Sequence, residues 1–205
     1  IPLGNCIGGG AHTHMKSTDV QEFLLIPKAK TFEERMVINR HLYVEMGKRL
    51  RATARTDEGA WIPNLATEET FAFLSAFLER HFEKGISVSL GIDVAASQLY
   101  KNNTYHYKNF SASSRKRIFT TKQHIAHVNK LISRYCLSYI EDPLHEEDFD
   151  GFAHISKKNC MVCGDDLITT NKERFRLALK HRSVNAIIVK PNQIGSLVQT
   201  KVLVD

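Results

Sequence analysis

The sequence has no long hydrophobic run. No stretch approaches the about 20 consecutive apolar residues that a membrane-spanning helix requires. No secretory signal, with its charged, apolar and small-residue regions, leads the chain. These absences argue against a spanning helix and against export, and we expect a cytoplasmic protein that makes no membrane contact.

The sequence also lacks any sign of a division into domains. It contains no linker, low-complexity tract or internal repeat, and 205 residues with 42% apolar side chains can bury one substantial core. A complete barrel of βα units usually takes about 250 residues. Since the chain begins with Ile1 and ends in an apolar stretch without a helix-stop signal, we expect a fragment or one half of a split protein.

Cysteine is scarce. The four cysteines lie in or beside apolar runs, as is typical of reduced, buried thiols in a cytoplasm; they are Cys6, Cys136, Cys160 and Cys163. The C-x-x-C spacing of the last two does not predict a metal or redox site. An offset of three residues along a strand points the two thiols to opposite faces of the sheet.

One segment contains no acidic residue. Residues 101–119 carry five of the six positive charges of the formal net charge, while the rest of the chain is nearly balanced; the basic residues are Lys101, Lys108, Arg115, Lys116 and Arg117. A local basic loop is more often a solvated surface than a binding site. Nucleic acid is therefore disfavoured as a partner.

A nucleotide-binding motif is absent as well. The segment IGGGAHTH has three glycines that would let a backbone approach a ligand closely, but it matches neither the Walker nor the dinucleotide fingerprint. His12 and His14 could ligate a metal, although histidines in loops usually do not.

What the sequence does contain is a charged residue at the end of each of several short apolar runs. Asp93 follows SVSLGI, Glu141 follows CLSYI, Asp165 follows CMVCG, and Lys190 follows NAIIV. Each run is typical of a buried parallel strand and is followed by a turn and a helix-like segment. Repeated βα units of this kind close into barrels, whose chemistry lies on the loops after the strands.

The order of the patterns predicts an α/β fold. Two strand-like runs at the start precede two amphipathic helices, and βα units follow from residue 87 onward. We count about six of the eight strands that a closed barrel needs. The expected fold is therefore an incomplete TIM-like barrel, with ββαα followed by βα units, in one domain over residues 1–205.

The strand-end charges suggest a metal site. Any one of Asp93, Glu141 and Asp165 could cap the helix that follows it. Three carboxylates at equivalent strand ends instead favour a shared ligand set, and oxygen donors without a histidine favour Mg²⁺ over zinc. Lys190, with its stem expected to be buried, could act as a base near the metal or form a structural salt bridge; spacing alone does not decide.

The segment RTDEGAWIP is also rich in acids. Asp57, Glu58 and Gly59 lie in a stretch without apolar periodicity, ahead of Pro63. Acids in such loops are usually solvated, so composition alone gives them no catalytic role.

Taken in order, seven segments resemble the successive motifs of the enolase family. They extend from about Leu3 to Ser196 and are IGGGAHTH, VQEFLLIP, DEGAWIPN, GIDVAAS, IEDP, GDDLITTN and IVKPNQIGS. DEGAW and VKPNQIG are similar to archaeal members. The resemblance implies an enolase-type barrel and a lyase of glycolysis and gluconeogenesis, which dehydrates 2-phosphoglycerate to phosphoenolpyruvate with Mg²⁺.

The resemblance also implies a role for each matching residue. Asp93, Glu141 and Asp165 would be the Mg²⁺ ligands. Lys190 would be the base that takes the proton alpha to the substrate carboxylate.

The same resemblance assigns residues outside the strand ends. Glu58 would be the acid that helps the hydroxide leave, with Glu22 assisting. His12 and Gln21 would line the substrate pocket, to which further residues contribute, namely Glu22, Glu141, Asp165 and Lys190.

Enolases also have a preceding capping domain and two further strands, with an H-R-S motif and a second lysine, which the resemblance does not find here. We therefore expect catalysis by a completed protein, as a homodimer or with a complementing chain. The alternative is a non-catalytic enolase-like fragment that binds a partner through an open sheet edge or through residues 101–119. A related dehydratase of acid sugars is disfavoured, because QEF, DEGAW and KPNQIG all fit enolase.

Overall fold

The computed structural model describes residues 2–109 and 117–205. The strands of its main sheet are β1 (Gly4–Gly8), β2 (Glu22–Pro27), β3 (Val88–Asp93), β7 (Tyr139–Glu141), β8 (Met161–Gly164) and β9 (Ala186–Ile187). They are hydrogen-bonded in the order β1-β2-β3-β7-β8-β9. β2 is antiparallel to both of its neighbours, whereas β3, β7, β8 and β9 are parallel to one another.

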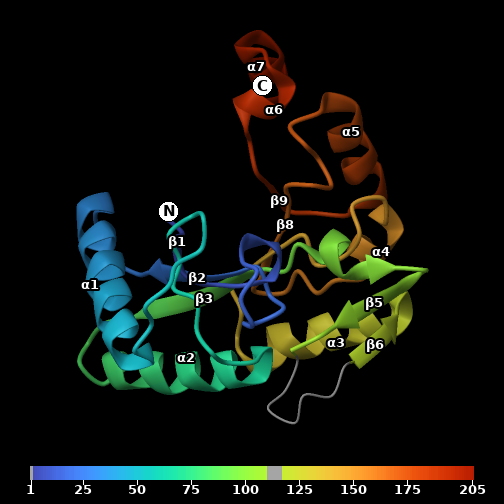
Figure 1. Ribbon diagram of the computed structural model, residues 1–205. Helices are drawn as coiled ribbons and strands as arrows, with labels where there is room; N and C mark the ends of the chain where they lie inside the picture. The colour runs from blue at the N-terminus through green and yellow to red at the C-terminus, as the bar shows by residue number, and fades with distance from the viewer. Residues whose placement is uncertain (1, 110–116) are drawn as a thin grey trace.

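Helices connect these strands. They are α1 (Phe32–Leu50), α2 (Thr67–Phe82), α3 (Thr121–Arg134), α4 (Phe149–Ala153), α5 (Lys172–His181), α6 (Pro191–Ile194) and α7 (Leu197–Val204). Figure 1 shows α6 and α7 standing away from the sheet beyond β9, on the side of α5. Within the described residues, none of these helices combines the length and the apolar character needed to pass through a bilayer.

This architecture confirms the expected fold. The six main strands occur in the order ββ, then two helices, then βα units, as the apolar runs predict. Over the described residues the sheet stays open between β1 and β9, so it is an incomplete barrel.

Both faces of the main sheet are buried. On β2, Phe23 and Leu25 belong to the large core beneath the helices, whereas Leu24 and Ile26 belong to a smaller inner cluster. Successive side chains of a strand point to opposite faces. Tyr139 of β7 also belongs to the inner cluster. Glu22, two residues before Leu24, and Glu141, two residues after Tyr139, therefore face the interior of the barrel as well.

Three of the four cysteines are buried, as expected. Cys160 lies in the large core and Cys163 in the inner cluster, which confirms that the two thiols face opposite sides of the sheet. The prediction was wrong for Cys136, which is exposed. This residue lies between the end of α3 and the start of β7, with a φ of 48°, so it belongs to the turn and not to the buried strand.

The basic segment is not simply a loop. A small antiparallel sheet is formed by β4 (Tyr100–Lys101), β5 (Thr104–Tyr107) and β6 (Arg117–Thr120). The alternation of buried Tyr105 and Tyr107 with less buried neighbours is a strand signal that the charge count obscured. Arg115 and Lys116 lie outside the described residues.

Gly47 allows α1 to pack against the loop that follows it. A Cβ atom at this position would lie 2.4 Å from two ring carbons of Trp61. Alanine normally favours a helix over glycine by about 1 kcal/mol, but here the indole would have to move. We expect Gly47→Ala to lower the free energy of unfolding by about 1–3 kcal/mol in urea denaturation. Val37→Ala, at an exposed position of α1, should change it by less than about 0.5 kcal/mol; a Gly47→Ala variant as stable as the parent would refute the packing argument.

Candidate active site

Charged side chains from neighbouring strands meet at one edge of the main sheet. Glu22 pairs with Asp93 across β2 and β3, and Asp93 pairs with Glu141 across β3 and β7. Because β2 is antiparallel to β3, the start of β2 lies beside the end of β3. Asp165 follows β8 and Lys190 follows β9, so this edge carries all five residues.

The three carboxylates expected to bind a metal are almost completely buried. Asp93 is 6% exposed, Glu141 is 9% exposed and Asp165 is 8% exposed. Asp93 accepts hydrogen bonds from Gln21 Nε2 at 3.0 Å and from the backbone N–H of Ala95 at 2.9 Å. These contacts fix the direction of the carboxylate without neutralising its charge.

Burial makes two of these carboxylates, Asp93 and Glu141, difficult to ionise. Burial, followed by the negative charge of Glu141, raises the pKa of Asp93 well above its ordinary value. Burial also raises the pKa of Glu141, although the hydroxyl of Tyr139, which donates a hydrogen bond to it, acts in the opposite direction. A bound cation would offset the cost of burying these charges and favour the ionised forms.

Lys190 forms an ion pair with Asp165. Its side chain is 44% exposed, so it is only partly buried; β9 is two residues long and is the last strand of the described sheet. Burial of the amine opposes its charge, but the hydrogen bond to Asp165 and the charges of Asp165 and Glu141 outweigh it and raise the pKa of Lys190. Of the two roles that spacing left open, the structure contains the salt bridge.

We call Asp93, Glu141 and Asp165 the acidic row. A second group of titratable side chains lies beside it. Potential ligand atoms of His12, Glu22 and Glu58 lie within 4.8 Å of one another. Burial, followed by a hydrogen bond shared with Glu58, raises the pKa of Glu22 to about 9. Glu22 is therefore protonated near neutral pH and can donate to Glu58. His12 Nδ1 lies 2.6 Å from Asp57 Oδ1, so the acidic loop that seemed solvated from composition reaches the site.

Contacts with α1 and β1 hold Glu58 in position. The hydroxyl of Tyr43 donates to the carbonyl oxygen of Gly59 at 2.6 Å, and Trp61 stacks on Tyr43 with ring centroids 5.1 Å apart. Gly59 has a φ of 84°, a conformation that favours glycine. Asn5 Nδ2 donates to Glu58 Oε2 at 3.2 Å. Tyr43 and Asn5 thus hold the turn that contains Glu58 and Gly59, and the Glu58 side chain points toward the sheet edge.

Sequence reasoning missed three contributors, Asp142, Tyr139 and Gln193. Asp142 is buried with a φ of 37°, and it accepts the backbone N–H groups of Asp165 and Asp166 at 3.2 and 2.7 Å. Gln193 Nε2 lies 3.4 Å from Asp165 Oδ1. The doubled acids in IEDP and GDDL were the available signal, because adjacent residues cannot both point into one site and one of each pair is free for a structural role.

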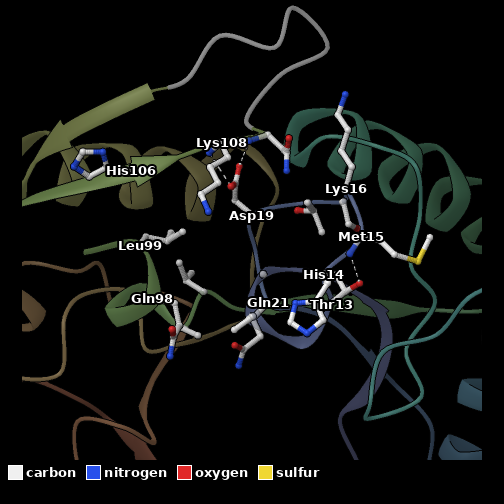
Figure 2. A pocket seen from close by; sticks show the side chains of 17 residues that line it. Thr13, His14, Met15, Lys16, Asp19, Gln21, Gln98, Leu99, His106 and Lys108 are labelled. Atoms are coloured by element: carbon white, nitrogen blue, oxygen red, sulfur yellow. Dashed lines mark hydrogen bonds between the residues drawn. The ribbon is translucent and has the colours of Figure 1, made fainter. Parts of the chain in front are cut away.

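A cavity of about 610 Å³ adjoins Gln21. It is lined mainly by the segment between β1 and β2, by residues that follow β3, and by residues in and just after β5. Figure 2 shows His14 and Gln21 on one side of it and Asp19 and Lys108 on the other. Asp19 accepts the backbone N–H groups of Lys108 and Asn109 at 2.8 and 2.6 Å. The cavity offers space for a small molecule beside the acidic row.

The metal-free chain is expected to lose stability as the pH rises from 6 to 9. The pKa of Glu22 in the folded chain is about 9, above the about 4.3 of an unfolded glutamate, and burial raises the pKa of Asp142 to about 8. Between these limits the folded chain binds more protons than the unfolded chain, so the free energy of unfolding falls with rising pH.

Thermal unfolding at several pH values measures this dependence. Glu22→Gln should flatten the decline, whereas Glu79→Gln, at an exposed position of α2, should leave it unchanged. A midpoint that is constant or rises over this range in the parent chain would contradict the buried, protonated state of Glu22.

Comparisons with known proteins agree on one family. A family model described as "Enolase, C-terminal TIM barrel domain" matches residues 1–203. The enolase of Archaeoglobus fulgidus is 44% identical over 203 residues, which cover 96% of this chain and 49% of the relative. The enolases of Methanocorpusculum labreanum and Thermoplasma acidophilum are 39% and 37% identical, with 98% and 96% of this chain and 51% and 49% of the relative covered. The chain thus spans about half the length of the curated relatives it matches.

Proposed function

Because this chain belongs to the enolase family, we propose that the complete protein is a hydro-lyase that converts 2-phosphoglycerate into phosphoenolpyruvate with Mg²⁺. One observation carries the proposal: three buried carboxylates, a lysine and a protonated carboxyl group meet at one edge of the sheet. The reaction needs a cation, a base and an acid around one small substrate, and this edge offers a candidate for each.

Asp93, Glu141 and Asp165 are the residues that would hold the metal. Their donor atoms are all carboxylate oxygens, which suit Mg²⁺. Burial raises the pKa of Asp93 and Glu141, and a cation held between these groups would favour their ionised forms. Bound Mg²⁺ would supply positive charge to these carboxylates and to the charge that develops on the substrate carboxylate.

Lys190 is the proposed base. A proton alpha to a carboxylate is weakly acidic, and its removal places two negative charges on one group. Lys190 is paired with Asp165 and its pKa is raised, so it must lose a proton before it can accept one from the substrate. Any loss of the Asp165 contact lowers the pKa of Lys190 toward a functional range, because burial already favours the neutral amine.

Glu58 and Glu22 are the proposed acid. Glu22 holds a proton near neutral pH and shares a hydrogen bond with Glu58, so the pair can deliver that proton to the departing hydroxide, which leaves as water. His12 lies in the same group, and Gln21 orients Asp93. Both are proposed to line the substrate pocket, together with the metal ligands.

We also propose that residues 1–205 form one domain, a part of the enolase barrel, and that turnover requires the remainder of the protein. The apolar side chains of α7 support a covering segment or partner, since Leu197 is 77% exposed, Val198 is 74% exposed and Val204 is 64% exposed. A complementing chain, or a homodimer of the complete protein, is the proposed partner. The family is the basis for proposing a cytoplasmic location.

An assay of the complete protein tests this function. Full-length protein, or this chain joined by its complementing part, is mixed with 2-phosphoglycerate, and phosphoenolpyruvate is measured. We expect product only with Mg²⁺, loss of turnover when a chelator removes the metal, and recovery when Mg²⁺ is restored. A complete, folded protein that forms no product under these conditions would sink the proposal.

A second candidate function is binding without catalysis. The open edge at β9 and the exposed apolar side chains of α7 favour it. A stoichiometric complex that survives high salt, without turnover, would support this alternative. Salt-sensitive binding that is lost when Arg115, Lys116 and Arg117 are neutralised would instead indicate an acidic partner.

A further inference from the structure

We propose that His41, Glu45 and His81 form a second metal site, for a divalent ion of the zinc class, on the helices that flank the sheet. His41 and Glu45 are four residues apart on α1 and therefore share a face of that helix, and His81 lies in the last turn of α2. One potential ligand atom from each residue lies within 4.8 Å of the other two. Figure 1 shows α1 and α2 beside the sheet. None of the three residues belongs to the candidate active site, whose own histidine group is His12, Glu22 and Glu58.

The distances suit one small ion. Glu45 Oε2 lies 3.0 Å from His81 Nε2 and 3.7 Å from His41 Nε2. In a tetrahedral site with bonds of about 2.0–2.1 Å, neighbouring ligand atoms are about 3.3 Å apart. The side chain of His41 is 60% exposed, so it can make the small movement that brings the three ligand atoms to this spacing.

Two of the three ligands are already oriented by other groups. His81 is 1% exposed, and its Nδ1 lies 2.7 Å from the carbonyl oxygen of Phe77, which can only accept; Nδ1 is therefore the donor. Nε2 faces Glu45 at 3.0 Å and is the nitrogen left to bind a metal ion. The other carboxylate oxygen of Glu45, Oε1, accepts from Arg49 Nε at 2.8 Å, which leaves Oε2 for the imidazoles. Such supporting hydrogen bonds are usual around metal ligands.

Space for a further ligand is present. A cavity of about 510 Å³ adjoins His41 and Glu45, so a water molecule can complete the coordination. Arg40 and Lys48 also line this cavity, and Arg49 binds Glu45. These three positive charges oppose a cation, and for this reason we expect binding weaker than at a thiolate site, with water or an anion as the fourth ligand.

The ligand types select the metal. Two imidazole nitrogens and one carboxylate oxygen are a common zinc set, whereas Mg²⁺ prefers oxygen donors in an octahedron. The site is therefore expected to ignore Mg²⁺. Its occupancy does not depend on the proposed enolase reaction, so either proposal can fail without the other.

Zinc titration of this chain tests the site. The chain carries His12→Ala, which removes the other histidine–carboxylate group, and is freed of metal with a chelator. Calorimetry with Zn²⁺ is then carried out in excess Mg²⁺, which competes for the carboxylate sites. We expect one equivalent of Zn²⁺, binding at least about tenfold more weakly in His41→Ala and in Glu45→Gln. His154→Ala, which replaces an exposed histidine elsewhere, should bind as the parent does.

Co²⁺ provides a direct view of the coordination. The intense visible absorption of tetrahedral Co²⁺ is expected in the parent and should be lost in His41→Ala. The side chain of His41 is 60% exposed, and circular dichroism checks that the variant keeps its fold. The proposal is overturned if Zn²⁺ does not bind, if both variants bind it with the affinity of the parent, or if Co²⁺ gives only an octahedral spectrum.

Discussion

Lys190→Ala in the complete protein is expected to lower the kcat for dehydration of 2-phosphoglycerate by about a thousandfold. A positioned general base contributes about 10²–10⁴ in rate, and alanine leaves nothing at this strand end to take the proton. KM should change less than kcat, because the amine acts mainly on the reacting proton. Steady-state formation of phosphoenolpyruvate measures the rate, and exchange of the alpha proton in deuterated water, followed by NMR, measures the proton transfer itself.

Lys190→Arg separates proton transfer from charge. A guanidinium keeps its positive charge and can pair with Asp165, but it cannot lose a proton near neutral pH. We therefore expect the arginine variant to be as inactive as the alanine variant. Lys180→Ala, at an exposed position of α5, should retain full activity. If Lys190→Arg kept more than about a tenth of the kcat, the base would have to be sought elsewhere.

Glu141→Gln is expected to weaken Mg²⁺ binding by at least about 100-fold. Removing a group that merely orients a metal ligand already costs about 10–100-fold in affinity, and Glu141 is proposed as a ligand itself. The amide keeps the shape of the side chain and its oxygen can still accept from Tyr139, so the change is mainly one of charge. Calorimetric titration with Mg²⁺ measures the affinity.

The same substitution is expected to stabilise the chain when no metal is bound. Burial and the nearby Asp165 disfavour the charged form of Glu141, and a neutral amide removes that penalty. The midpoint of thermal unfolding should therefore rise without Mg²⁺ and respond less to its addition. Glu83→Gln, at an exposed position after α2, is the matched control. Parent-like Mg²⁺ affinity in Glu141→Gln would remove this residue from the ligand set.

The strand-end part of the site could be predicted from the sequence. Asp93 and Glu141 each end a short apolar run, and the ends of parallel strands meet at one edge of a sheet. Their register confirms this meeting, since the two residues are directly paired. The family followed from the order of seven segments, and the comparisons confirm it.

Other parts depend on contacts that no local pattern encodes. Glu58 reaches the sheet edge through Asn5, Tyr43 and Gly59, which are up to 54 positions apart in the sequence. The exposure of Lys190 depends on how many neighbours β9 has, which its own apolar residues do not reveal. Periodicity therefore finds strands and their ends, whereas it cannot find a loop residue whose position is set by distant side chains.

The reversed direction of β2 separates the places where the chain can be lengthened from those where it cannot. Its first residue lies at the acidic edge, while its last lies at the opposite edge, where the Lys28 N–H bonds the carbonyl oxygen of Ser87 at 2.9 Å. Extra residues or a fused label at 28–31 or 83–87 would thus lie far from the cavity that adjoins Gln21. One residue added between positions 13 and 20 would instead displace Gln21 and threaten the register of Glu22. The first two segments suit the attachment of probes, and the third suits changes of specificity.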